Sequence, residues 1–291
     1  MNSILVIIVT YNSMEWIDRC MESLYNSSIG NDIFIVDNKS SDETITHLKA
    51  NHKFSHLVES EVNLGFGRAN NLGLKYALDQ GYEYIYLLNQ DAWIFESTFD
   101  DLIRTHKKYK QFGILSPMQL NAGSKKLDDN FLLCCPKKML SDLYFNEVKD
   151  VYETEFVMAA HWLIGRECLQ KVGGFSASFP HYGEDHNFLH RANYFEYRTG
   201  IVPSASAIHD RGLRVESNKV TIEKLYLEAI AEVSNTNKNL ILALFKQPLK
   251  LVILGIKIRS KDCIFNSLRL IIRFPVLISN RNKSKLSAFL G

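Results

Sequence analysis

The sequence predicts an α/β fold in which helices cover both faces of a doubly wound, mostly parallel sheet. Three short apolar runs rich in β-branched and aromatic residues indicate buried strands, at Ile4–Val9, Asp32–Asp37 and Tyr84–Leu88. Segments of helical spacing separate these runs, and Val58 lies in a further short strand. Strands that alternate with helices through short links are typical of such a sheet.

The first half of the chain divides at residues that cap or break its elements. A helix is predicted from Met14 to about Tyr25, with Ser13 as its cap. Asp42 places an acid in the first turn of the next predicted helix, where the helix dipole favours it. The glycine-bearing loop Asn63–Asn71 leads into the third predicted helix.

The second half has weaker patterns. From residue 121 to residue 155 the periodicity is poor, which predicts an irregular loop or a small hairpin of the kind that often serves as a lid. Around this segment the pattern predicts a helix from Glu96 to Gln111, a strand at Gly113–Ser116 ended by Pro117, a strand at Phe156–Ala160, a helix at Arg166–Val172, and short last strands at 201–203 and 205–209.

Composition limits the class of protein. The chain has 291 residues, of which 46% are hydrophobic, so it can bury one large core or two small ones. Its five cysteines are an odd number without CxxC spacing, which predicts reduced thiols in a cytosolic protein. The first apolar run is short and lacks a basic start, so no signal peptide is expected and the chain should stay on the cytoplasmic side.

The C-terminal part differs in charge from the rest. From Lys238 to Gly291 seven Lys, four Arg and one acid give a net charge of +10, so a total of +2 leaves about −8 for the preceding residues. We predict a catalytic domain at residues 1–215 and a basic amphipathic helical region at 216–291. The helices would lie on an anionic membrane surface at the inner face, or cover the catalytic domain or a partner subunit, a homo-oligomer included. Nucleic acid is not expected, because aromatic residues are few among the basic ones.

Polar residues follow three of the predicted strands, at Asn12, Asp37 and Asp91. The carboxyl ends of parallel strands share one edge of a sheet, so these side chains can line a single crevice. No glycine follows the first strand, as a dinucleotide fold would require, and no P-loop is present. These absences argue against a dinucleotide site and a P-loop site, and they leave the polar crevice as the candidate ligand site.

Four motifs in order resemble family 2 glycosyltransferases, and most closely their rhamnosyltransferase-like branch. The motifs are Val9-Thr-Tyr-Asn12, Val36-Asp-Asn-x-Ser-x-Asp42, Asn63-x-Gly-Phe-Gly-x-Ala-Asn-Asn71 and Leu87-Leu-Asn-Gln-Asp91. The resemblance covers roughly Ile4 to Gly212 and implies a GT-A fold, with a Rossmann-like nucleotide half followed by an acceptor half. The chain departs from the family in having Gln90 where Pro is common and Asn89 where a metal-binding Asp is common, so only Asp91 matches as a metal ligand.

The resemblance implies a nucleoside-diphosphate sugar as donor, either a UDP-sugar or a dTDP-sugar. Asp37 would bind the base or ribose, although it could instead cap the turn before Ser41. Gly65 and Gly67 would let the backbone approach the donor closely, and Arg68 would offer charge to its diphosphate. The other implied donor-binding residues are Thr10, Tyr11, Asn12, Asn89 and Gln90.

The resemblance also extends to the second half. Gly174-Phe175, Glu184-Asp185 and Arg191 match a family pattern whose acidic pair supplies the catalytic base. Asp185 is favoured as the base and Glu184 as its neighbour, or the two roles are reversed. Helix capping alone would also place acids there. By the same resemblance, Asp91 and His209 would hold a divalent metal, Mg²⁺ or Mn²⁺, and His161 and Trp162 would contact the acceptor; structural roles compete for the last three.

The implied reaction is an inverting, metal-dependent transfer of a sugar to a saccharide or lipid-linked saccharide in cell-surface polysaccharide synthesis. By resemblance alone the sugar would be rhamnose. Two alternatives remain open. One is a nucleotidyltransferase that makes sugar nucleotides; a glycine-rich basic loop after the first strand would favour it, and none is present. The other is a catalytically decayed binding or scaffold subunit, with Asn89 and Gln90 as early signs of decay.

Overall fold

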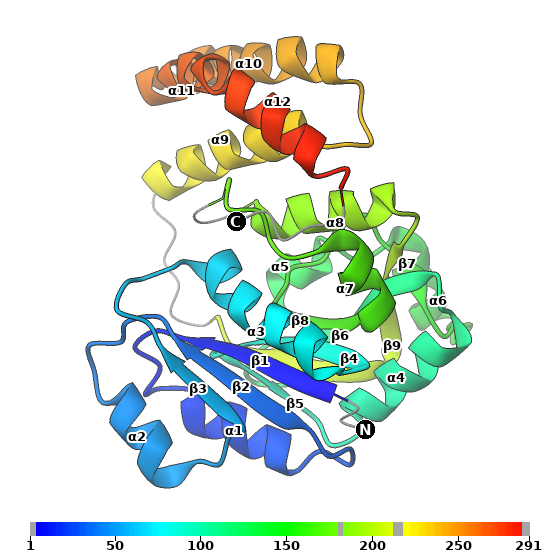
Figure 1. Ribbon diagram of the computed structural model, residues 1–291. Helices are drawn as coiled ribbons and strands as arrows, with labels where there is room; N and C mark the ends of the chain where they lie inside the picture. The colour runs from blue at the N-terminus through cyan, green and yellow to red at the C-terminus, as the bar shows by residue number, and fades with distance from the viewer. Residues whose placement is uncertain (1–3, 180–182, 212–217, 287–291) are drawn as a thin grey trace.

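A single mixed sheet forms the centre of the protein. The computed structural model describes residues 4–179, 183–211 and 218–286, and in these residues nine strands form one sheet of order β3-β2-β1-β4-β8-β6-β9-β5, with β7 paired to β9. Helices lie on both faces of the sheet, and four further helices stack beyond one face (Figure 1). The predicted α/β class with helices on both faces is confirmed.

The N-terminal half of the sheet is parallel. Strands β1 (Ile4–Thr10), β2 (Asp32–Asp37), β3 (His56–Glu59) and β4 (Tyr84–Asn89) pair in parallel, with Thr10 opposite Asp37 and Val9 opposite Asn89. They are connected by helices α1 (Ile17–Tyr25), α2 (Thr44–Asn51) and α3 (Phe66–Gln80). Their carboxyl ends therefore form one common edge.

The remaining strands are mixed in direction. Strand β8 (His161–Gly165) is antiparallel to both β4 and β6 (Phe112–Leu120), and β9 (Arg198–His209) is parallel to β6. Strands β5 (Ala92–Ile94) and β7 (Tyr152–Glu153) are antiparallel to β9. Four pairings are thus parallel and four antiparallel, so the expectation of a mostly parallel sheet holds only for the nucleotide half.

Two hydrophobic cores enclose the sheet. Side chains of β1 alternate between them: Leu5 and Ile7 pack under α3, α7 (Arg166–Val172) and α8 (Glu184–Tyr194), whereas Val6 and Ile8 pack against α1, α2 and α4 (Thr98–Lys108). Burial on both faces explains why these strands read as continuous apolar runs instead of alternating ones.

Several predicted boundaries in the second half are wrong. Pro117 does not end a strand, because β6 shifts register between Pro117 and Met118 and thereby accommodates the missing N–H. Residues 156–160 are not a strand; the strand is the next segment, β8. The two short last strands are one strand, β9. The predicted irregular segment 121–155 contains α5 (Asp129–Leu132), α6 (Lys137–Tyr144) and β7.

The C-terminal helices have a core of their own. Helices α9 (Asn218–Ser234), α10 (Leu240–Lys257), α11 (Lys261–Ile272) and α12 (Phe274–Lys283) enclose residues such as Tyr226, Leu251 and Leu277, together with Phe179 from the sheet domain. Helix α9 ends at Ser234, and Pro248 lies inside α10. The predicted boundary at residues 215 and 216 lies outside the described residues and stays a prediction.

The helical region is attached to α8. Asn237 donates a hydrogen bond to the backbone oxygen of His190 at 2.6 Å, and Asn280 bonds the hydroxyl of Ser178. Within the part of the chain that the structure describes, none of the helices combines the length and the hydropathy needed to cross a bilayer.

Candidate active site

Asp37 and Thr10 lie side by side at the ends of β2 and β1. Both oxygens of the Asp37 carboxylate accept hydrogen bonds, from Thr10 Oγ1 at 3.0 Å, Ser40 N at 2.8 Å and Ser40 Oγ at 2.5 Å. Neither Thr10 nor Asp37 has exposed surface. The structure therefore shows Asp37 capping its own turn, which is the alternative that the sequence left open; a direct role in donor binding stays a prediction.

Tyr11 is held by Gln90 across the sheet edge. The Tyr11 N–H donates to Gln90 Oε1 at 2.6 Å, and Gln90 Nε2 donates to the Tyr11 carbonyl at 3.1 Å. The Tyr11 side chain is 47% exposed, so its ring faces the edge where the strands end. Gln90, which departs from the family motif, thus connects the β1 and β4 loops by two hydrogen bonds that a proline could not make.

Asn12 adopts a left-handed backbone conformation with φ of 50°, which Asn tolerates better than most residues. Its N–H donates to Ser40 Oγ at 2.9 Å, and its side-chain oxygen accepts from Ser41 N at 2.8 Å. The loops after β1 and β2 are therefore fastened to each other before any ligand arrives. Asn89 is half-buried, and its N–H donates to the Ala160 carbonyl at 3.1 Å.

The glycine loop connects the two halves of the molecule. Gly65 has φ of 76° at the start of α3, a conformation that favours glycine. A Cβ on Gly67 would lie 3.0 Å from Phe175 Cβ and 3.7 Å from Glu184 Cβ, so this position is glycine because α3 packs closely against the catalytic segment. Arg68 is exposed beside it.

The Gly-Gly-Phe segment is positioned by two side chains, the half-buried Asn71 and the fully buried Arg191. Asn71 accepts from the Phe175 N–H at 2.7 Å and donates to the Phe175 carbonyl at 2.9 Å. Arg191, with no exposed surface, donates to the carbonyls of Gly174 and Val172. The spacing of Gly174, Glu184 and Arg191 in the sequence thus reflects a framework that fixes where α8 begins.

Asp91 and His209 form a buried pair between β5 and β9. Asp91 Oδ1 lies 3.5 Å from His209 Nε2, and the side chains are 4% and 1% exposed. Burial lowers the pKa of His209, while the Asp91 carboxylate opposes that shift. Arg211 Nε donates to His209 Nδ1 at 3.3 Å and lies 3.5 Å from Asp128 Oδ2.

The acidic pair stands at the first turn of α8. Burial raises the pKa of Glu184 to about 8, and the neighbouring Asp185 carboxylate adds to the shift. Within the described residues, Glu184 Oε2 has no hydrogen-bond partner. Asp185 is half-buried and accepts from the His186 N–H at 2.8 Å. Burial raises the pKa of Asp185 too, opposed by His186 and Arg211.

Arg211 connects the two groups of acids. It hydrogen-bonds His209, which contacts Asp91, and its charge stabilises the ionised form of Asp185. On the other side, Glu184 lies against Gly67 in the first turn of α3. The loops after β1, β2 and β4 and the start of α8 therefore surround one site.

His161 and Trp162 have no exposed surface at this site. His161 donates or accepts at both ring nitrogens, with Tyr86 OH at 2.8 Å and the Ile208 carbonyl at 2.9 Å, and burial lowers its pKa to about 3. Trp162 donates to the Val157 carbonyl and packs on Phe175. Both side chains have 0% exposure. Neither side chain offers surface to an acceptor in this structure, and the His161 ring lies beside the ring of His209; a role in acceptor binding stays a prediction.

Two residues of the cluster escaped the sequence analysis, Asp128 and Arg211. Asp128 caps α5 by accepting from Phe131 N at 2.8 Å, and it belongs to the segment that was predicted to be irregular. The only sequence signal for Asp128 was that an aspartate can cap a helix that begins at the next residue. Arg211 lies two residues after His209, a position that carries no motif.

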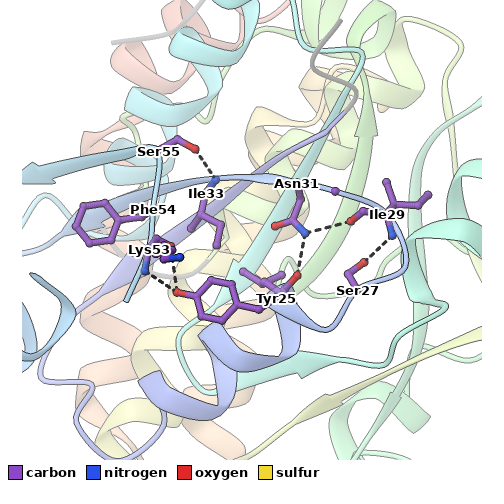
Figure 2. A pocket seen from close by; sticks show the side chains of 10 residues that line it. Tyr25, Ser27, Ile29, Asn31, Ile33, Lys53, Phe54 and Ser55 are labelled. Atoms are coloured by element: carbon purple, nitrogen blue, oxygen red, sulfur yellow. Dashed lines mark hydrogen bonds between the residues drawn. The ribbon is translucent and has the colours of Figure 1, made fainter. Parts of the chain in front are cut away.

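The hollow drawn in Figure 2 is a different place. Its volume is about 370 Å³, and it is lined by residues such as Tyr25, Ile33 and Phe54 at the start of β2, the opposite end of the strand from Asp37. None of the predicted site residues lines it.

Comparison with a family model identifies the class to which this protein belongs. Residues 5–158 match the model of glycosyl transferase family 2, which is more than half of the chain, and the protein belongs to that family. It is a glycosyltransferase with a GT-A-like fold, as predicted.

Individual relatives agree with this assignment. The chain is 26% identical over 212 residues to the low-salt glycan biosynthesis hexosyltransferase Agl10 of Haloferax volcanii, which covers 71% of this chain and 66% of Agl10, slightly less than two thirds of that protein. It is also similar in structure to S. aureus TarS 1-349 in complex with UDP-GlcNAc, with a TM-score of 0.61, 16% identity and coverage of 97% and 88%. GalNAc-T7 with UDP, GalNAc and Mn²⁺ is similar over 80% of this chain and 50% of its own, with a TM-score of 0.59 and 13% identity.

Proposed function

We propose that the protein transfers a hexose, with inversion, from a UDP-sugar to a saccharide or lipid-linked saccharide acceptor in glycan synthesis. The observation that carries the proposal is the meeting of Asp91–His209 and Glu184–Asp185 through Arg211 at one edge of the sheet. The names of Agl10 and of the UDP-GlcNAc complex of TarS support a hexose and uridine. A rhamnose donor on deoxythymidine diphosphate rests only on the sequence resemblance.

The buried pair suits a divalent metal. Asp91 offers a carboxylate oxygen and His209 an imidazole nitrogen, and both side chains are buried at the sheet edge. Coordination by His209 Nε2 requires the ring hydrogen on Nδ1, so Arg211 must turn from His209 toward Asp128, which its Nε already approaches to 3.5 Å. A bound Mg²⁺ or Mn²⁺ would supply positive charge against the leaving diphosphate. The Mn²⁺ in the GalNAc-T7 complex supports this choice.

Asp185 is the proposed base. It is the more exposed member of the pair, and Arg211 and His186 favour its ionised form. Glu184, with a pKa of about 8, stays protonated at neutral pH and offers a donor to the acceptor or to the donor sugar. A carboxylate within about 3 Å of the acceptor hydroxyl removes its proton as the hydroxyl attacks the anomeric carbon.

The donor loops would bind the nucleotide. The exposed Tyr11 ring can stack on the base, and the Asn12, Ser40 and Gln90 network keeps that ring in place. Arg68 is exposed at the start of α3, beside the glycine loop, and can approach the diphosphate. Thr10, Asp37 and Asn89 are less exposed and would support this surface from beneath.

The test is hydrolysis of a panel of nucleoside-diphosphate sugars, measured with Mn²⁺ or Mg²⁺ and after chelation. We expect slow release of UDP from one UDP-hexose, dependent on the metal. A nucleotidyltransferase would instead consume UTP and a sugar phosphate and release pyrophosphate. A decayed scaffold subunit would bind a donor without turnover. Either result contradicts the proposal.

We further propose that α10 lies on an anionic membrane surface. Its exposed apolar side chains follow helical spacing and form one stripe, and exposed lysines flank it; the apolar residues are Leu242, Phe245, Leu249, Ile253 and Ile256, and the lysines are Lys246, Lys250 and Lys257. Such a stripe suits the headgroup region of a bilayer, where a lipid-linked acceptor would also be found.

Vesicle sedimentation tests this second proposal. Binding is expected with vesicles containing anionic lipid, and the double variant Leu249→Asp/Ile253→Asp should abolish it. A matched control, Leu132→Asp on the exposed part of α5, should bind like the parent. If the parent instead remains in solution and has the mass of a dimer that the double variant lacks, the stripe is a subunit interface, and the membrane proposal is wrong.

A further inference from the structure

A second group of potential metal ligands lies away from the active site, between α1 and α2. His47 Nε2 is 2.6 Å and His52 Nε2 is 2.7 Å from the same oxygen, Asp18 Oδ1. The ligand atoms of the three residues all lie within 4.8 Å of one another, and the described ranges contain no other group of three such residues. The proposed glycosyl transfer makes no use of them.

The hydrogen bonds around His52 are compatible with a cation between these groups. Tyr25 OH donates to the Lys53 carbonyl at 3.0 Å and accepts from Lys53 N at 2.9 Å, contacts drawn in Figure 2. Its hydrogen is therefore used, so the 3.4 Å contact with His52 Nδ1 is best satisfied when that nitrogen carries a hydrogen. In that tautomer a neutral ring presents the lone pair of Nε2 to Asp18 Oδ1 at 2.7 Å, an arrangement that a metal ion bound to both atoms would satisfy.

We propose that Asp18, His47 and His52 bind a transition-metal dication, with Zn²⁺ the best match. Two imidazole nitrogens and one carboxylate oxygen form a ligand set that zinc and its neighbours accept, whereas Mg²⁺ prefers oxygen ligands only. The site thus differs in chemistry from the proposed catalytic metal. Solvent would complete the coordination, because the Asp18 side chain is 55% exposed.

The ligands need only a small rearrangement. Tetrahedral zinc with bonds of about 2.0–2.1 Å keeps its ligand atoms about 3.3 Å apart, so each nitrogen must separate from the Asp18 oxygen by about 0.6–0.7 Å. Asp18 is free to rotate at the surface, while His52 has a side chain only 6% exposed and is held by its neighbours. The Tyr25 hydroxyl gives the His52 ring the second partner that metal-bound histidines usually have. The Asn51 amide nitrogen lies 3.1 Å from both His47 Nδ1 and the His47 carbonyl, so it would have to move away when Nδ1 carries a hydrogen.

The consequence of binding would be structural. Asp18 lies in the first turn of α1, and His47 and His52 belong to α2 and its C-terminal cap. These helices follow the loops of Asn12 and Ser40, which carry the proposed donor surface. A metal that joins α1 to α2 would stabilise that edge without contacting the donor.

The experiment is a calorimetric titration of chelator-treated protein with ZnCl₂. It uses the Asp91→Asn background, which removes the proposed catalytic ligand. One equivalent should bind, and adding His47→Gln and His52→Gln should weaken binding at least ~100-fold. His56→Gln is the matched control, because His56 stacks on Phe34 and belongs to no cluster. Equal Zn²⁺ affinity in the double-histidine variant and its parent would overturn the proposal.

Two readouts separate the metal from a plain ion-pair cluster. With Zn²⁺ at 100 times its Kd, Tm should rise by about 5 °C, and Mg²⁺ should not raise it. Cu²⁺ bound in the same background should show coupling to two nitrogens, which both variants Asp18→Asn and His47→Gln should change. If Zn²⁺ leaves Tm unchanged, or if Mg²⁺ shifts it equally, the three residues form only an ion-pair cluster. Asp18→Asn keeps the test available if the double-histidine variant fails to fold.

Discussion

The two sides of the site satisfy their polar groups in opposite ways. We call them the donor edge, at Asp37 and Gln90, and the catalytic edge, at Glu184 and Asp185, after the roles proposed for them. At the donor edge, the Asp37 carboxylate accepts three hydrogen bonds, and Gln90 makes two with Tyr11. At the catalytic edge, Glu184 is buried with one oxygen that lacks a partner in the described residues, and its pKa is raised to about 8. The first edge is shaped by the folded protein alone, whereas the second holds groups whose partners are expected in the substrate complex.

The largest effect is expected from Asp185→Asn, which removes the proposed base. Turnover should fall about 10²–10⁴-fold, the range of general base catalysis, while the Kd for the UDP-sugar changes little. Steady-state kinetics and calorimetry would measure the two quantities. Asp129→Asn, at a highly exposed position, is the control that should leave both unchanged. Near-full transfer activity in the Asp185→Asn variant would contradict the assignment of the base.

Asp91→Asn should act on the donor complex. Loss of the carboxylate next to His209 should weaken Mn²⁺-dependent donor binding by about 100-fold and leave the weaker metal-free binding intact. Titration of a UDP-sugar with Mn²⁺ and with EDTA would show the difference. If donor binding by the variant still responds to Mn²⁺ as it does in the parent, Asp91 is not a ligand of the metal.

Asp37→Ala tests whether the hydrogen bonds of Asp37 stabilise the donor edge. The substitution leaves Thr10 Oγ1 and the Ser40 N–H and hydroxyl without their shared acceptor in a buried turn. We expect the free energy of unfolding to fall by about 3 kcal/mol, measured by urea denaturation at pH 7. Ser41→Ala, at an exposed position of the same turn, is the control. A stable Asp37→Ala variant would mean that the donor edge is not shaped by this network.

Glu184→Gln should raise the free energy of unfolding at high pH, because burial of an ionisable Glu184 destabilises the folded state there. The folded state keeps the Glu184 proton up to about pH 8, whereas the unfolded chain loses it near pH 4.5, so stability falls as pH rises through that window. The Glu184→Gln variant lacks this loss. It should match the parent near pH 4.5 and exceed it by up to about 5 kcal/mol above pH 8. Denaturation at both pH values would check this, and a gain that is equal at both would exclude ionisation as its cause.

Local patterns predicted the first half of the fold well. Strands β1, β2 and β4 are buried on both faces, so their apolar runs are continuous and end abruptly at polar residues. The second half was predicted less well, because partners distant in the sequence decide it. Pro117 is accommodated by a register shift against β9, and Asp128 is ordered where it caps α5 and meets Arg211.

The roles of single residues divide in the same way. The motifs alone identify the family and mark Asp91, Glu184 and Asp185 as candidates, because strand ends and helix starts can be read from short segments. Only the tertiary structure showed that Asp37 caps its own turn, and that His161 and Trp162 lie inside the sheet domain. Burial and hydrogen-bond partners depend on segments that are tens of residues apart, and a linear pattern carries no record of them.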